Sequence, residues 1–376
     1  MLSKISTFAL LCIASYTVPV ASKPHLVVFG DSFSDNGNIP NTENSLTLWK
    51  GHFSDGPVWN EYLAYFNDYT LINYAYGGAT SNDTSVIKFT GTSPRRPSVP
   101  SQISNFTSTF GGKFLPEAIT QDIAVVEVGT NDINFGIELI VNNTIDKENY
   151  SDSIVSNILE SVDRIRNLGY RKILVTTVPN LKTSPFILDY SISGRENASN
   201  FINLINEKLV LAINKRAYPN NNSEVNIVDL DKILSLVTGQ IGKELGIKVT
   251  DKRCYELADG KIKSICPNSN EYMFKDEIHP TTKVHSFIAS VFAEIIKNAE
   301  FKIDIESTLP LIAKYDLANA NSLSNFMYYS DSYQTGKMKI ESYNILRANI
   351  NTRSIINTHN RDAKPRKCNG YYRYKY

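Results

Sequence analysis

Strand-like segments alternate with helix-like segments along most of this chain, from residue 25 to about residue 298. The strand-like segments are rich in Val, Ile, Leu or Tyr, and two of them are largely apolar or β-branched, which is typical of strands buried on both faces of a parallel sheet. They are His25–Phe29, Thr70–Tyr74, Ile123–Val128, Lys172–Val178 and Val225–Val228. The main helix-like segments are Val58–Phe66, Ser151–Leu168, Glu196–Tyr218 and Lys283–Asn298. This alternation predicts an α/β three-layer sandwich built on a mostly parallel, five-stranded sheet.

The two ends of the chain differ from this central part. Residues 1–22 have the features of a secretory signal peptide, because a lysine precedes the apolar run Phe8–Val20 and small residues follow it. That run is shorter than the roughly 20 residues that a membrane span needs. We therefore expect a cleaved signal at 1–22, a single domain at 23–298, and a C-terminal extension at 299–376.

The extension ends in a basic stretch in which tyrosines are interleaved with Lys and Arg. Such a tail could bind a polysaccharide or an acidic surface. We favour the alternative that the extension is partly disordered, since chain termini are often loosely packed.

Export from the cell would place the cysteines in an oxidising environment. Cys254 and Cys266 flank a turn-rich stretch, and we expect a local disulfide between them, just ahead of Asp276. Pairing of either cysteine with Cys368 is the alternative. Sequons for N-glycosylation agree with a secreted, extracellular glycoprotein and begin at Asn82, Asn105, Asn142, Asn149, Asn197 and Asn221.

Charge and motif content argue against several classes of function. Lys and Arg number 39 and Asp and Glu number 38, so the formal net charge of +1 provides no field for nucleic acid or an anionic membrane. We expect no metal site, because neither a Cys-x-x-Cys nor a His-x-x-x-His spacing occurs. No Gly-rich phosphate loop is present, so we expect no cofactor.

Four short motifs carry the residues that ester chemistry requires. In chain order they are Gly30-Asp31-Ser32, Tyr76-Gly77-Gly78-Ala79, Gly129-Thr130-Asn131-Asp132 and Asp276-Glu277-Ile278-His279-Pro280. The first three follow the first three predicted strands. In parallel sheets, binding and catalytic residues lie in the loops beyond the carboxyl ends of the strands. We therefore expect these three motifs to meet at that end of the sheet.

Ser32 is the predicted nucleophile, and His279 is the predicted base that accepts its proton. Of the five histidines, only His279 has a carboxylate three residues upstream in a loop-like segment. Asp276 is therefore predicted to bind the imidazole and to fix its tautomer. Glu277 is the rival for this role, but it should point away if the segment turns.

An acyl-transfer site also needs donors for the oxyanion of its tetrahedral intermediate. The backbone N–H groups of Ser32 and Gly78 and the side-chain amide of Asn131 are the predicted donors. A glycine suits position 78 because a Cβ would crowd the approaching carbonyl. Asp31 and Asp132 are expected to support these loops.

Together the four motifs resemble those of the GDSL (SGNH) hydrolase family, whose named residues correspond to Ser32, Gly78, Asn131 and His279. The stretch 49–59 is similar to that of secreted microbial and plant-type members of the family. The stretches 73–80 and 279–282 are similar to those of fungal carbohydrate acetylesterases and bacterial extracellular lipases of this type. The resemblance implies a flavodoxin-like strand order 2-1-3-4-5 and a serine esterase that works without a cofactor. Neither the Gly-x-Ser-x-Gly of α/β-hydrolases nor the His-Glu-x-x-His of zinc hydrolases occurs.

Three aromatic residues are candidates for substrate contact. Trp49, Phe53 and Trp59 could stack on a sugar or line an acyl chain, or they could pack in the core. No long apolar lid is present, so we expect a short-chain, acetyl ester on an extracellular carbohydrate as substrate. A lipid or phospholipid acyl ester is the alternative substrate. A non-catalytic carbohydrate-binding protein on the same scaffold is the alternative of another class.

Overall fold

A computed structural model describes residues 23–42, 45–216, 224–258, 261–320, 340–344 and 350–363. The predicted signal peptide, Cys368 and most of the basic tail lie outside these residues. Among the helices of these residues, none is both long enough and apolar enough to cross a membrane.

The central sheet is parallel and has the strand order β10-β2-β1-β3-β4-β5. Its strands are β1 (His25–Gly30), β2 (Thr70–Asn73), β3 (Ile123–Glu127), β4 (Lys172–Thr176), β5 (Glu224–Val228) and β10 (Glu341–Asn344). All five predicted strands and their order are confirmed. The predicted count of five strands is wrong, because β10 from the C-terminal part of the chain extends the sheet beside β2. This strand is short and polar, so it gives no apolar signal in the sequence.

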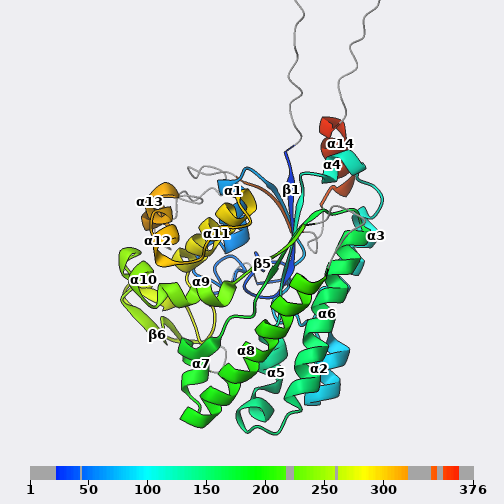
Figure 1. The fold of residues 1–376 in the computed structure, drawn as a ribbon. Coiled ribbons are helices and arrows are strands. Elements are labelled where there is room, and N and C mark those ends of the chain that lie inside the picture. The colour runs from blue at the N-terminus through cyan, green and yellow to red at the C-terminus, as the bar shows by residue number, and fades with distance from the viewer. Residues whose placement is uncertain are drawn as a thin grey trace, which may run out of the picture.

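Helices cover both faces of the sheet (Figure 1). Along β1, Leu26 and Val28 belong to one buried cluster, whereas Val27 and Phe29 belong to the other. Alternate residues of β1 thus pack into two cores, one on each face of the sheet, which explains why this segment is continuously apolar. The first core lies under α1 (Trp59–Phe66), α9 (Leu230–Val237) and α11 (Thr282–Lys297). The second lies under α3 (Val99–Phe110), α5 (Thr130–Val141), α6 (Lys147–Asn167) and α8 (Ile192–Lys215).

The remaining elements are short or peripheral. The helices are α2 (Asp83–Thr90), α4 (Pro116–Ile119), α7 (Pro185–Leu188), α10 (Gln240–Glu244), α12 (Ile305–Thr308), α13 (Leu311–Lys314) and α14 (Thr352–Ala363). The additional strands are β6 (Val249–Arg253), β7 (Tyr255–Ala258), β8 (Lys261–Ile265) and β9 (Tyr272–Phe274). Strand β6 pairs with β9, and β7 pairs with β8 as a hairpin.

The β7–β8 hairpin is closed by the predicted local disulfide between Cys254 and Cys266. The backbone N–H of Cys254 donates to the carbonyl of Phe274 at 3.1 Å, and the N–H of Tyr255 donates to that of Lys275 at 2.7 Å. The disulfide-linked hairpin therefore braces the segment that leads directly into Asp276.

The C-terminal helix α14 packs at the amino-terminal ends of the strands, near the start of β1. His359 Nε2 lies 3.0 Å from the Asp122 carboxylate, and the ring of His359 stacks on that of His25 with 3.6 Å between centroids. Described parts of the chain beyond residue 298 thus contribute both a strand and a packed helix to the α/β fold.

Candidate active site

The structure brings Ser32, His279 and Asp276 into one hydrogen-bonded series. Ser32 lies in the turn after β1, and its Oγ is 2.8 Å from Nε2 of His279. The other ring nitrogen, Nδ1, lies 2.8 Å and 3.0 Å from the two carboxylate oxygens of Asp276. An imidazole held in this way can take a proton from the hydroxyl while its other face stays bonded to the carboxylate.

The Asp276 carboxylate is fixed by its own turn. Its Oδ1 accepts the backbone N–H groups of Ile278 at 3.1 Å and His279 at 2.9 Å. Nζ of Lys275, which is also buried, lies 3.3 Å from Oδ2. Burial acts to raise the pKa of Asp276, but His279, Lys275 and these hydrogen bonds outweigh it and lower the pKa below its usual value. The carboxylate is therefore ionised at neutral pH.

Glu277, the rival orienting residue, points away from the imidazole. Its carboxylate forms a salt bridge with Nη1 of Arg253 at 2.9 Å. The geometry thus selects Asp276 over Glu277 as the partner of His279.

Ser32, His279, Gly78 and Asn131 line the same open cleft, which has a volume of about 260 Å³. Gly78 has a φ of +85°, in the region that favours glycine. A Cβ at this position would meet Cγ of Arg96 at 3.1 Å. The loops that carry Ser32, Gly78 and Asn131 therefore meet beyond the carboxyl ends of β1, β2 and β3, as their strand order predicts.

Nδ2 of Asn131 donates to the carbonyl of Ala79 at 2.9 Å and contacts Oδ2 of Asp31 at 3.3 Å. Asp132 is fully buried and accepts the N–H and hydroxyl of Ser81 at 2.9 Å and 2.6 Å. Burial raises the pKa of Asp132 to about 6, despite these hydrogen bonds. Asp31 and Asp132 thus support the surrounding loops.

Two further side chains at this site were not predicted from the sequence. Glu127, at the end of β3, is buried and accepts the hydroxyl of Ser34 at 2.8 Å. A carboxylate that ends an otherwise apolar strand is a signal that could have identified it. Arg96 lines the cleft beside Gly78, and its position in an irregular loop left no such signal.

The three aromatic candidates occupy different environments. Phe53 lines the cleft, with its ring centroid 5.0 Å from that of His279. Trp59 is 1% exposed, stacks on Phe292, and donates its indole N–H to Ser34 at 3.0 Å. Trp59 therefore lies in the core and is not a substrate contact, which corrects that expectation. Trp49 packs against His52 and is not among the residues that line the cleft.

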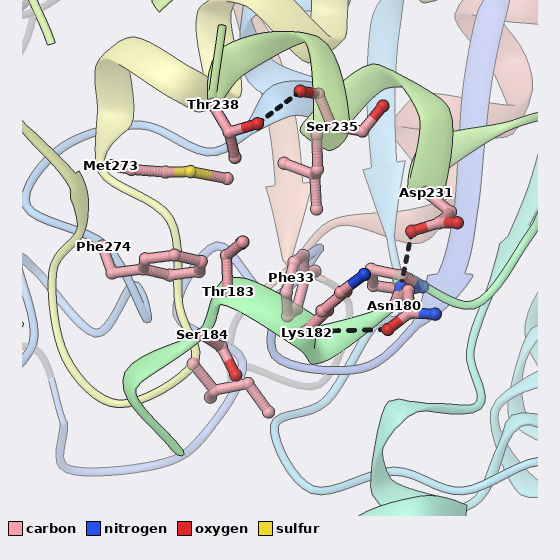
Figure 2. A pocket seen from close by; sticks show the side chains of 13 residues that line it. Phe33, Asn180, Lys182, Thr183, Ser184, Asp231, Ser235, Thr238, Met273 and Phe274 are labelled. Carbon is pink, nitrogen blue, oxygen red and sulfur yellow. Dashed lines mark hydrogen bonds between the residues drawn. The ribbon is translucent and has the colours of Figure 1, made fainter. Parts of the chain in front are cut away.

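A second cavity, of about 360 Å³, adjoins this region (Figure 2). Figure 2 shows Met273 and Phe274 on one side and Asn180, Lys182 and Asp231 on another. Phe33 and Ile278 also line it. Phe33 directly follows Ser32, and Ile278 directly precedes His279. Ile278 also lines the cleft that contains Ser32.

In the described part of the chain, one group of three side chains, His25, Asp122 and His359, has the composition of a metal site. The two imidazole planes are stacked and only 16° from parallel. An ion in the plane of one ring would lie out of the plane of the other, which does not suit lone-pair coordination. The cluster lies at the starts of β1 and β3, away from Ser32.

Comparison with known proteins agrees with this geometry. The family model of the GDSL-like lipase/acylhydrolases matches residues 26–292. A thermolabile hemolysin of Vibrio parahaemolyticus is 25% identical over 303 residues, which cover 74% of this chain and 65% of the hemolysin. An acetylesterase of Thermothelomyces thermophilus is 27% identical over 301 residues, covering 74% of this chain and 90% of that enzyme. A GDSL esterase/lipase of Arabidopsis thaliana is 25% identical, covering 73% of this chain and 87% of the plant protein. The chain belongs to the GDSL-like lipase/acylhydrolase family and is a carboxylic ester hydrolase.

Proposed function

We propose that the chain hydrolyses esters through an acyl-enzyme formed on Ser32, with His279 as base and Asp276 as its orienting partner. The observation that carries this proposal is the 2.8 Å contact between Ser32 Oγ and His279 Nε2, continued by Nδ1 to Asp276. A serine hydroxyl becomes an effective nucleophile only when such a base accepts its proton.

In the first step Ser32 Oγ bonds to the ester carbonyl carbon while its proton passes to His279 Nε2. The carbonyl oxygen takes up the negative charge opposite the N–H groups of Ser32 and Gly78 and the amide of Asn131. The bond to the alcohol then breaks, and the alcohol oxygen leaves with the proton from Nε2. Water repeats the sequence on the acyl-enzyme and releases the acid.

We infer that the natural substrate is a short-chain, acetyl ester of an extracellular carbohydrate. The cleft at Ser32 is small and open, and polar side chains of Thr130, Asn131 and Asn134 line it together with Arg96. These groups suit a hydroxyl-rich alcohol more than a lipid tail. The similarity to an acetylesterase supports the same choice.

A lipid acyl ester is the second candidate, and the cavity of about 360 Å³ favours it. Leu234, Met273 and Phe274 provide apolar surface there, and the shared residue Ile278 places this cavity next to the catalytic cleft. An acyl chain that passed Ile278 would gain about 0.8 kcal/mol for each buried CH₂ group.

Turnover of p-nitrophenyl acetate by purified protein tests the central proposal. Ser32→Ala should lose nearly all activity while its melting temperature stays close to that of the wild type. Turnover retained by this variant would exclude Ser32 as the nucleophile.

A chain-length series separates the two substrates. If acetyl esters are preferred, acetylated xylo-oligosaccharides should be cleaved faster than phospholipid in vesicles. Preference for palmitoyl esters would overturn the carbohydrate proposal. In that case Thr238→Trp, which narrows the second cavity, should lower activity on long esters only. Lys232→Trp is the matched control, because Lys232 lies on the helix that Thr238 ends but does not line the cavity.

We also propose that the protein is exported and glycosylated. The disulfide between Cys254 and Cys266 supports an oxidising compartment. Among the sequon residues, Asn105 and Asn149 are exposed on helix surfaces. Expression of the full chain in a eukaryotic host should yield protein in the medium that lacks residues 1–22 and loses mass on deglycosylation. Retention of those residues in intracellular protein would contradict export.

A further inference from the structure

Two buried carboxyl groups, those of Asp31 and Glu127, lie together where β1 and β3 end, and Asp31 directly precedes Ser32. Asp31 is 0% exposed and Glu127 is 1% exposed, and their side chains are hydrogen bonded to each other. The pairing of β1 with β3 sets Gly30 opposite Glu127, and a Cβ on Gly30 would lie 2.7 Å from the Glu127 carbonyl oxygen. The glycine thus lets the two strands bring these carboxyls together. A hydrogen bond between two carboxyl groups requires that one of them carries a proton.

The surrounding donors favour the ionised form of Glu127. The indole N–H of Trp59 donates to Ser34 Oγ at 3.0 Å, so the hydroxyl hydrogen of Ser34 is directed to Glu127 at 2.8 Å. Asp31 accepts the backbone N–H of Phe33 at 3.0 Å and the Asn131 amide at 3.3 Å, and both contacts are longer than the one that Ser34 makes with Glu127. Asp31 is therefore the member of the pair that holds the proton.

The electrostatic environment agrees with one shared proton. Burial and the neighbouring Glu127 raise the pKa of Asp31 well above its usual value, and burial raises the pKa of Glu127 to about 7. Asp132 also faces the pair and acts in the same direction on Asp31. Among the described residues neither carboxyl takes part in a salt bridge, and the ring nitrogens of His279 contact Ser32 and Asp276.

The proton on Asp31 bears on the oxyanion donor Asn131. The amide of Asn131 has two hydrogens, one directed to Ala79 at 2.9 Å and the other to Asp31 at the longer distance of 3.3 Å. Only the hydrogen directed to Asp31 can turn to an oxyanion while the shorter bond to Ala79 stays intact. An ionised Asp31 would hold that hydrogen in a charge-assisted bond and would repel the oxyanion, whereas a neutral acid does neither.

We propose that Asp31 and Glu127 share one proton, that it stays on Asp31 while the enzyme works, and that Asp31 thereby keeps an amide hydrogen of Asn131 available to the oxyanion. Asp31 is then a positioning residue that acts through Asn131, and no proton leaves the pair during the reaction. This inference rests on the proposed roles of Ser32 and Asn131.

Glu127→Gln tests the proposal because it reverses the hydrogen bond within the pair, so that position 127 donates and Asp31 accepts. The new amide donates to Asp31, which also accepts the N–H of Phe33 at 3.0 Å, and Asp31 becomes ionised. We expect kcat to fall by about 10²-fold, the usual effect of removing one oxyanion donor, with little change in KM.

Adding Asp31→Asn to Glu127→Gln should restore most of the lost kcat, because position 31 is then neutral again. A purely structural pair predicts a further loss, so additive losses in this double-mutant cycle would overturn the proposal. Wild-type kcat should also decline at alkaline pH as the shared proton leaves, and this decline should be absent from the double variant. Asp122→Asn is the control. It changes an equally buried carboxyl that lies at the opposite end of the strands, just before β3.

A spectroscopic measurement separates this inference from the proposed function. In Ser32→Ala protein with ¹³C-labelled Asp and Glu carboxyls, one buried carboxyl should be protonated at neutral pH, and its signal should vanish on Asp31→Asn. Two ionised carboxyls would refute the shared proton even in an active esterase. If no ester were hydrolysed, the proposed function would fail while this measurement would still decide the state of the pair.

Discussion

Replacement of Gly78 by alanine separates the proposed oxyanion role of its backbone N–H from its role in the fold. The residue has a φ of +85°, which costs an L-amino acid about 1–2 kcal/mol. The new Cβ would lie 3.1 Å from Cγ of Arg96, an exposed side chain that can move by the few tenths of an ångström required. We therefore expect the free energy of unfolding to fall by no more than about 2 kcal/mol.

The effect on catalysis should be much larger. To reduce the strain, the peptide at the substituted position rotates toward negative φ, and its N–H turns away from the cleft. Loss or displacement of one oxyanion donor lowers kcat by about 10²-fold. The measurements are kcat and KM with p-nitrophenyl acetate and unfolding by urea, made on the same preparation.

Gly246→Ala is the matched control. Gly246 has a φ of +80°, and nothing lies within 4 Å of a Cβ at that position, so the variant carries the same backbone strain away from the cleft. Its unfolding free energy should fall by a similar amount while its kcat stays at the wild-type value. If Gly78→Ala loses no more activity than Gly246→Ala, the Gly78 N–H is not an oxyanion donor.

Three further predictions concern stability. Replacing Cys254 and Cys266 by serine opens a loop with a sequence separation of 12 and should lower the unfolding free energy by about 3 kcal/mol in urea; an unchanged midpoint would contradict this estimate. Burial holds the pKa of His285 at about 3, so the native ring stays neutral where the unfolded chain binds a proton. Relative to wild type, His285→Gln should therefore gain about 1.4 kcal/mol in stability for each pH unit below 6.5, and a difference independent of pH would exclude a neutral His285. A chain that stops before Glu341 loses β10 and exposes the edge of β2, so light scattering should detect aggregation that the full chain does not show.

The sequence contained most of what determines the site. The strands around Leu26 and Val125 are buried on both faces, so their apolar character was visible without any partner. Asp276 and His279 lie three residues apart on one turn, so a local pattern was enough to pair them. Ser32 and Asn131 could be brought together because the ends of parallel strands meet.

What the sequence did not reveal depends on contacts between distant segments. Trp59 looked like a candidate sugar platform, and only the packing of α1 against α11 shows that Phe292 covers it. The role of Glu127 depends on its register beside Gly30, which no local pattern encodes. Strand β10 consists of Glu, Ser, Tyr and Asn, and it pairs with a strand that lies far away in the sequence, as the separation of 271 between Thr70 and Glu341 shows.

The pairing of β10 with β2 has a consequence for biosynthesis. Thr70 Oγ1 bonds to Glu341 across 271 residues, so the margin of the sheet stays open until nearly the whole polypeptide has emerged. During that interval the nascent chain exposes a row of unpaired amides to its neighbours, a state that invites intermolecular association. A chaperone acting late in synthesis would therefore protect this protein more than one that acts early.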